Sequence, residues 1–317
     1  GGRDRRRERQ LGRRGDRRRS VSPTGSGTER RVQTPDGRTL QVLERGVPDG
    51  PAVLVHNGTP NSRLMADAEV RSAERQGIRL ISYDRPGYGG SSRQAGRTVG
   101  DCAQDVRTIA GALGIDRLAV WGISGGGPHA IASAALLPDL VPAVGVLAST
   151  APWGAEGLDY FADMGELNVE DTKLQLEDPV AARAKCEEDR KEMLALEPEQ
   201  LLDYLKTLLS PVDAAVLTGA FARYIIDATR SGLAPGSDGW WDDGVAFLEP
   251  WGFELDAIET PVLLRHGRHD RFVPYGHGEW LARHIPGVTA ELTEDDGHLT
   301  QVMLHIDHVH DWLLERL

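Results

Sequence analysis

The stretch "LAVWGISGGGPHA", residues 118–130, decides the fold. An apolar run ends at Gly122, a single serine then stands among glycines, and helix-forming residues follow. A Gly-x-Ser-x-Gly pattern between a strand and a helix forces a reversal so sharp that the flanking residues must lack a Cβ. Ser124 would then be exposed at the carboxyl edge of a sheet, and the N–H of Gly125 would point to where an oxyanion forms. We therefore expect Ser124 to be a nucleophile.

Two other interpretations of this stretch remain open. The residues also fit Gly-x-Gly-x-x-Ala, a dinucleotide-binding pattern, at Gly125, Gly127 and Ala130. Such sites need an acidic residue at the end of the next strand, whereas the run 143–150, "AVGVLAST", ends in serine and threonine. The second alternative is a packing turn with an incidental serine. Residues elsewhere in the chain favour the interpretation of Ser124 as a nucleophile.

A serine nucleophile needs a base to accept its proton and an acid to orient that base. Asp270 follows the apolar run 261–267, and His298 lies in a glycine-containing loop after the last predicted strand. We expect both side chains to meet Ser124 at one edge of the sheet. Thr59, in the loop "HNGTP", is the candidate for a second N–H in the oxyanion hole.

The remaining sequence predicts an α/β fold. A predicted hairpin comes first, and helical patterns, the first of them near 61–76, then alternate with five apolar runs at 52–57, 79–84, 118–122, 143–150 and 261–267. Near-continuous apolar strands between helices indicate a mostly parallel sheet that helices cover on both faces. The segment 152–250 departs from this rhythm, because its charged amphipathic helices are not separated by a convincing strand. We expect it to form an inserted helical cap.

Charge divides the chain of 317 residues, whose formal net charge is −12. Residues 1–31 hold 12 arginines and four acidic residues, whereas the predicted cap holds 21 acidic and eight basic residues. We predict a disordered arginine-rich tail at 1–28, a core formed by 29–151 and 251–317, and the cap at 152–250. The most apolar window, 130–149, is interrupted by two prolines and an aspartate, so no membrane span is expected.

Further motifs accompany the serine turn: "DRPGYGGSS" at 84–92, "HGRHD" at 266–270 and "DGH" at 296–298. With them the chain resembles the α/β-hydrolase family over about residues 30–317, in its serine hydrolase branch with proline iminopeptidase and esterase relatives. The resemblance implies the α/β-hydrolase fold and a cap over the active site. "HNGTPNS" replaces the His-Gly-Gly-Pro-Gly stretch of the aminopeptidases. Epoxide hydrolases and dehalogenases of this fold use an aspartate nucleophile, and Ser124 argues against both.

These features predict a serine hydrolase, esterase- or aminopeptidase-like, that cleaves an ester, amide or related carbonyl bond of a small molecule through an acyl-enzyme on Ser124. The alternatives are a receptor-like ligand-binding protein and an acyltransferase of the same fold. We expect no cofactor or metal, no nucleic-acid or membrane partner, and a cytoplasmic location; the oligomeric state is left open. Trp153, Trp240 and Trp241 either line the substrate pocket or fasten the cap to the core.

The other histidines and the cysteines carry weaker signals. His305, His308 and His310 lie on the last predicted helix, but no cysteine or carboxylate completes a metal site in the sequence pattern. His56 and His129 are expected to be structural. Cys102 and Cys186 stand far apart, which suits a reducing compartment.

Overall fold

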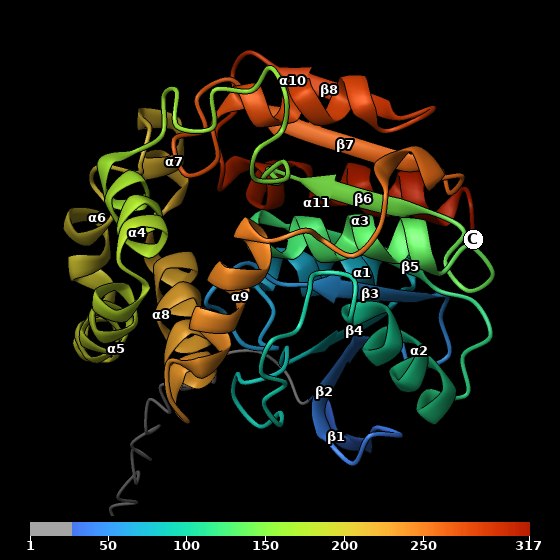
Figure 1. Ribbon diagram of the computed structural model, residues 1–317. Helices are drawn as coiled ribbons and strands as arrows, with labels where there is room; N and C mark the ends of the chain where they lie inside the picture. The colour runs from blue at the N-terminus through green and yellow to red at the C-terminus, as the bar shows by residue number, and fades with distance from the viewer. Residues whose placement is uncertain (1–26) are drawn as a thin grey trace, which may run out of the picture.

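The computed structural model describes residues 27–317, which form one eight-stranded sheet in the order β1-β2-β4-β3-β5-β6-β7-β8 (Figure 1). The tail predicted at 1–28 therefore lies outside the described residues, apart from its last two. The strands are β1 (Thr28–Gln33), β2 (Thr39–Gly46), β3 (Ala52–His56), β4 (Arg79–Tyr83), β5 (Ala119–Ile123), β6 (Val144–Leu147), β7 (Val262–Gly267) and β8 (Thr289–Thr293). β1 and β2 form the predicted antiparallel hairpin, and all strands from β4 to β8 in this order pair in parallel.

Helices cover both faces of the sheet, as the fold prediction required. One face carries α1 (Asp67–Gln76) and α11 (Thr300–Leu314), and the other carries α2 (Cys102–Leu113), α3 (Gly127–Leu136) and α10 (Tyr275–His284). In β5, Val120 packs into one hydrophobic cluster, whereas Ala119 and Trp121 pack into the other. Successive strand residues point to opposite faces, so a strand that is buried on both faces must be apolar throughout.

The chain between β6 and β7 holds α4 (Glu166–Glu177), α5 (Pro179–Ala195), α6 (Leu201–Tyr204), α7 (Pro211–Val216), α8 (Gly219–Leu233) and α9 (Asp238–Leu248). Figure 1 shows these helices at the end of the sheet toward which the parallel strands point. A third hydrophobic cluster joins leucines of α6 and the following turn to α8, and Ala66 and Leu299 of the core also belong to it. By contrast, Ala246 and Phe247 of α9 pack in the main core.

The loop after β3 differs from the helix expected over 61–76, since α1 begins only at Asp67. Asn57 accounts for part of this difference, because its side-chain amide donates to the carbonyls of Ser62 and Leu64 at 2.7 and 3.0 Å. These bonds hold the intervening residues in a loop at the carboxyl edge of the sheet. None of the helices within 27–317 has the length and apolar character needed to cross a membrane.

Candidate active site

Ser124 lies at the turn between β5 and α3, in the left-handed backbone conformation with φ of +56°. A non-glycine residue in this region is strained, and such strain is held only where the surroundings impose it. Here the surroundings are backbone: a Cβ on Gly126 would lie 1.9 Å from the His56 carbonyl oxygen, and one on Gly122 would lie 2.2 Å from the Gly126 carbonyl oxygen. The glycines thus allow β3 and the turn to approach closely enough to present Ser124.

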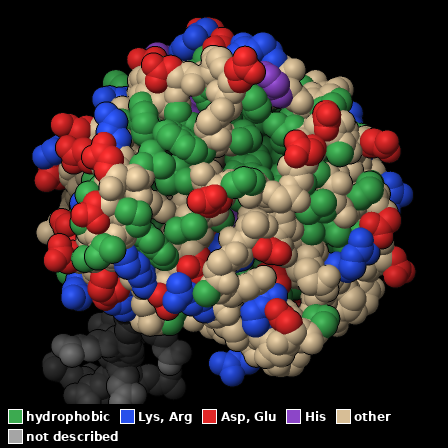
Figure 2. Space-filling view, in the orientation of Figure 1, with side chains coloured by type: hydrophobic (Ala, Val, Ile, Leu, Met, Phe, Trp, Pro, Cys, Tyr) green, Lys and Arg blue, Asp and Glu red, His purple; other side chains and the backbone are tan. Residues whose placement is uncertain are grey.

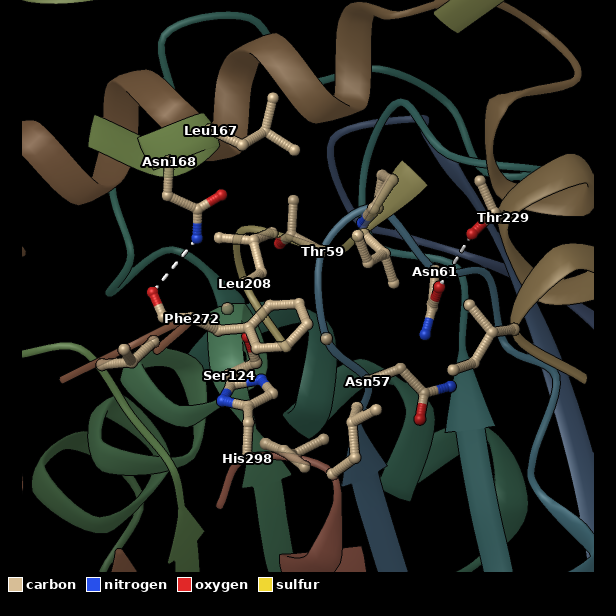
Figure 3. Close-up of a pocket in the computed structure, with 18 of the residues that line it drawn as sticks. Asn57, Thr59, Asn61, Ser124, Leu167, Asn168, Leu208, Thr229, Phe272 and His298 are labelled. Carbon is tan, nitrogen blue, oxygen red and sulfur yellow. Dashed lines mark hydrogen bonds between the residues drawn. The ribbon is translucent and has the colours of Figure 1, made fainter. Parts of the chain in front are cut away.

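His298 and Asp270 reach the same site from the loops after β8 and β7. The His298 Nδ1–H donates to Asp270 Oδ2 at 2.8 Å, while Asp270 Oδ1 accepts the N–H groups of Phe272 and Val273 at 2.9 Å each. Figure 3 shows the His298 ring directly below Ser124, and both residues line one cavity. With Nδ1 committed to Asp270, His298 Nε2 is the ring atom left to exchange a proton with the serine.

Two carboxylates set the protonation of His298. Burial opposes the charged imidazole, but the negative charges of Asp270 and Asp213 outweigh this effect and raise the pKa of His298 above its ordinary value. Both carboxylates are buried, so water screens them little. The Phe272 ring stacks on the imidazole with a centroid separation of 4.5 Å and fixes its plane.

Asp213, on cap helix α7, holds the backbone of the histidine loop. Its carboxylate accepts N–H bonds from His298 at 3.0 Å, Leu299 at 2.7 Å and Thr300 at 3.4 Å, together with the Ser210 hydroxyl at 2.9 Å. Three of these donors belong to the loop and first residue of α11, where helical N–H groups lack partners within the helix. A Cβ on Gly297 would lie 2.3 Å from this carboxylate, so the glycine of "DGH" makes room for it.

The residues predicted for the oxyanion hole lie beside the serine. A Cβ on Gly125 would lie 2.2 Å from Thr59 Oγ1, and one on Gly58 would lie 3.4 Å from the Ser124 Cβ. The turn carrying Gly125 and the loop carrying Thr59 are therefore in direct contact. The Thr59 hydroxyl donates to Asp243 Oδ2 and accepts from Arg85, each at 2.9 Å, and these bonds fix the loop.

A buried ion network anchors that loop to α9. Asp243 Oδ2 lies 2.6 Å from Arg85 and accepts the Tyr88 hydroxyl at 2.8 Å, while Asp243 Oδ1 lies 2.6 Å from Arg97. Burial alone would raise the pKa of Asp243, but the two guanidinium groups hold it well below its ordinary value. Arg85 also donates to the backbone carbonyl of Asn57. The network thus connects the "DRPGYGGSS" loop, α9 and the "HNGTP" loop that carries Thr59, called the oxyanion loop below.

The histidines of α3 and α11 have structural partners. His129 Nδ1 donates to the Gly125 carbonyl at 2.9 Å, and burial lowers the pKa of His129 to about 3, so its ring is neutral. His305 and His308 contact Asp296 and Glu291 respectively, and His310 contacts Ser72. Within 27–317, no cluster of three or more His, Cys, Asp or Glu side chains has the arrangement of a metal site.

A cavity of about 360 Å³ opens at Ser124 between the core and the cap. Figure 2 shows hydrophobic side chains gathered in the upper middle of the molecular face, around the junction of cap and core. Most of the wall is apolar, with contributions from Met164, Leu167, Leu196, Leu205, Leu208, Phe221, Ile225 and Phe247. Apolar pockets of this size with few polar groups are the usual form of small-molecule sites.

The three candidate tryptophans have different positions. Trp240 lines the cavity, whereas Trp153 and Trp241 are not among the described residues that form its wall. The Trp241 ring lies under the Arg183 guanidinium at 5.7 Å, and Trp153 packs on Tyr160 with ring centroids 4.9 Å apart.

Some residues of the site could not be identified from the sequence. Asp213, Asp243 and Phe272 hold parts of the machinery, yet no local pattern distinguishes the two aspartates from the other acidic residues of the insert. Finding Asp213 would have required evidence that the segment "SPVD" at 210–213 contacts the "DGH" loop. Asn168 of α4 also donates to the Phe272 carbonyl at 3.1 Å (Figure 3), a contact that depends on how the cap folds back.

Comparisons with known proteins agree with this architecture. A family model described as "alpha/beta hydrolase fold" matches residues 51–302. A bifunctional esterase/perhydrolase of Acinetobacter calcoaceticus is 26% identical over 77% of this chain and 83% of its own length. Epoxide hydrolase A of Mycobacterium tuberculosis is 28% identical over 85% of this chain and 97% of its own length. A solved thermophilic esterase from Thermogutta terrifontis superposes with a TM-score of 0.64 at 20% identity, covering 91% of this chain and 98% of that one.

Proposed function

Because the chain belongs to the alpha/beta hydrolase family and hydrolases are among its relatives, we propose that it is a serine hydrolase that forms an acyl-enzyme on Ser124. One observation carries this proposal. The His298 ring, bonded to Asp270 at 2.8 Å, lies next to a serine held at φ of +56° in a shared cavity. The substrate would be an ester, amide or related carbonyl compound of small size. The relationship to an epoxide hydrolase does not extend to its chemistry, because a serine stands at the nucleophile position.

The proposed reaction uses this chain's own groups for every proton. Ser124 Oγ attacks the carbonyl carbon while its proton passes to His298 Nε2, and the N–H groups of Thr59 and Gly125 stabilise the oxyanion. Collapse of the tetrahedral intermediate breaks the bond to the leaving group, which takes the proton from His298. Water then attacks the acyl-enzyme, with His298 again as base, and releases the carboxylic acid and the free serine. Asp270 stabilises the imidazolium in both steps, so no metal or organic cofactor is required.

The cavity limits the substrate. Its wall is mainly leucine, methionine, isoleucine and aromatic side chains, which favours an apolar acyl or alcohol group. A volume of about 360 Å³ suits a small molecule and excludes a folded polypeptide from the serine.

A fluorophosphonate probe tests the nucleophile directly, because it reacts with serines that a neighbouring base activates. The wild-type protein should be labelled once and should hydrolyse 4-nitrophenyl esters with many turnovers. Ser124→Ala should abolish both, while Ser231→Ala, a control on cap helix α8, should behave as wild type. Labelling that persists in Ser124→Ala, or a single turnover of the ester, would refute the proposal.

A further inference from the structure

The cavity contains a buried carboxyl group that the proposed reaction does not use. Glu69 lies on α1, is only 2% exposed and lines the cavity. Its Oε2 accepts the backbone N–H of Ala66 at 2.7 Å, which caps the helix. Its Oε1 makes no hydrogen bond to any residue within 27–317, and no lysine or arginine in that part of the chain forms an ion pair with it. A carboxyl group in this position is costly unless something else completes its bonds.

Asn57 presents a second free acceptor to the same cavity. Its Nδ2 donates to the carbonyls of Ser62 and Leu64, and since carbonyls only accept hydrogen bonds, these contacts fix which end of the amide is nitrogen. Asn57 Oδ1 is left without a partner among the described residues, although the side chain is buried and lines the cavity. In its carboxylate form, Glu69 together with Asn57 Oδ1 offers acceptors that a ligand with N–H groups would satisfy.

The charges around the cavity favour a cation over a neutral donor. No lysine or arginine is among the described residues of the wall, and the wall's other acid, Asp171, is paired with Lys185 at 2.9 Å. Tyr224 also lines the cavity and stacks on Phe221 with ring centroids 5.8 Å apart. Aromatic faces beside a carboxylate are a common environment for bound ammonium groups.

From these contacts we propose that Glu69 and Asn57 form a subsite for a protonated amine carried by the substrate. The inference rests on the proposed serine hydrolase function and makes its substrate an ester or amide that also carries an ammonium group. The apolar side chains of the cavity wall would hold the carbon chain that joins the two groups.

The ionisation of Glu69 fits this role. Burial raises the pKa of Glu69 to about 8, so a positive charge beside it is needed for the carboxylate form to dominate at neutral pH. When an ammonium ion enters, the Glu69 proton leaves to solvent and the carboxylate pairs with the cation. A helix-capping role needs only one carboxyl oxygen, and a glutamine would fill it equally well.

Two substrates of the same shape test the proposal: 4-nitrophenyl 4-(dimethylamino)butanoate, which is cationic, and 4-nitrophenyl 5-methylhexanoate, its neutral isostere. The wild-type protein should have the larger kcat/KM for the cationic ester, after correction for the rates of the two esters in buffer. Glu69→Gln keeps the Ala66 bond and should reduce that preference by about tenfold or more, as expected for a lost charge-assisted hydrogen bond. Glu74→Gln, the matched control, removes an exposed acid on the same helix that does not line the cavity, and it should keep the wild-type ratio.

The outcomes separate this inference from the proposed function. Turnover of the neutral ester that depends on Ser124 supports the hydrolase by itself. If the wild-type protein then shows no preference for the cation, or if Glu69→Gln slows both esters equally, the subsite is refuted and the hydrolase stands. Should Glu69→Gln fail to fold, the affinities of Ser124→Ala for hexylammonium and for hexan-1-ol, measured by calorimetry, test the subsite instead. Tighter binding of hexylammonium would support it. Equal affinity for the two would overturn the proposal.

Discussion

Replacing Asp213 with asparagine tests whether helix α7 positions His298, the proposed catalytic base. Asparagine has nearly the same size but offers one acceptor oxygen and an NH₂ group in place of two acceptors. If the oxygen keeps Leu299 and Thr300, the NH₂ group faces the His298 N–H, which donated to Asp213 Oδ2 at 3.0 Å. The substitution therefore leaves a buried backbone donor without a partner.

The size of the effect follows from those bonds. An unsatisfied buried N–H costs about 1–3 kcal/mol, and the bonds that remain lose their charge assistance, so we expect a loss of about 2–4 kcal/mol. For a chain of this length, that lowers Tm by about 3–6 °C. A displaced His298 should also reduce kcat, since small misplacements of a catalytic group are expensive.

The pH profile should move in a direction that simple destabilisation does not produce. Only neutral His298 can accept the serine proton, so kcat/KM falls as pH drops through the His298 pKa. The Asp213 charge raises that pKa, so removing the charge should shift the acid limb to lower pH. The measurements are thermal unfolding and the kcat/KM profile of Asp213→Asn, with the exposed cap residue Asp203, changed to asparagine, as control. A wild-type Tm, or an acid limb that stays in place or moves upward, would show that Asp213 does not act on His298.

Three further substitutions test other parts of the site. Asp243→Asn leaves two buried guanidinium groups without a counter-ion and should lower the free energy of unfolding, measured in urea at pH 7, by about 3–5 kcal/mol. Folding lowers the pKa of Asp243 from 3.8, so its carboxylate contributes fully to stability above that pH, and the difference between variant and wild type should shrink on acidification. A difference that stays constant with pH would contradict the ion pairs. Gly126→Ala should prevent soluble expression, because its Cβ would lie 1.9 Å from the His56 carbonyl oxygen. In the control Gly111→Ala, in α2, the added Cβ meets nothing within 4 Å, and the free energy of unfolding should rise by about 0.5–1 kcal/mol. Equal behaviour of the two variants would refute the close-packed turn. Trp240→Ala should raise the ratio of kcat/KM for 4-nitrophenyl octanoate over acetate, since Trp240 lines the cavity, and an unchanged ratio would place its ring away from the acyl chain.

The sheet was predictable because its signal is local. Every residue of β3 is buried, and the first four are apolar, because a strand buried on both faces does not alternate between apolar and polar residues. The start of α1 was missed by six residues because the loop before it is held by long-range contacts. Ser62 N–H, for example, donates to the carbonyl of Ala228 on a cap helix 166 residues later in the chain. No window of local sequence contains that contact.

The same distinction applies to the site. Ser124, Asp270 and His298 each follow a strand, so the parallel topology alone brings their positions to one edge of the sheet. Asp213 and Asp243 reach that edge from the insert, where 21 acidic residues have similar local surroundings in the sequence. Their roles depend on the path of the cap across the core, which hydrophobic periodicity does not encode.

The two aspartates also constrain how a substrate can enter. One carboxylate of the segment between β6 and β7 holds the histidine loop, and the other holds the oxyanion loop, so a rigid swing of the whole segment would break both halves of the machinery. The outer helices differ: none of the twelve described residues of α4 is buried, and in α5 only Ala182 is. Segments with so few buried side chains open at low cost in free energy. We therefore expect hydrogen exchange to be fastest in α4 and α5 and slow in α7 and α9, with substrate passing through a local opening of the outer pair while the two buried carboxylates keep the catalytic loops in place.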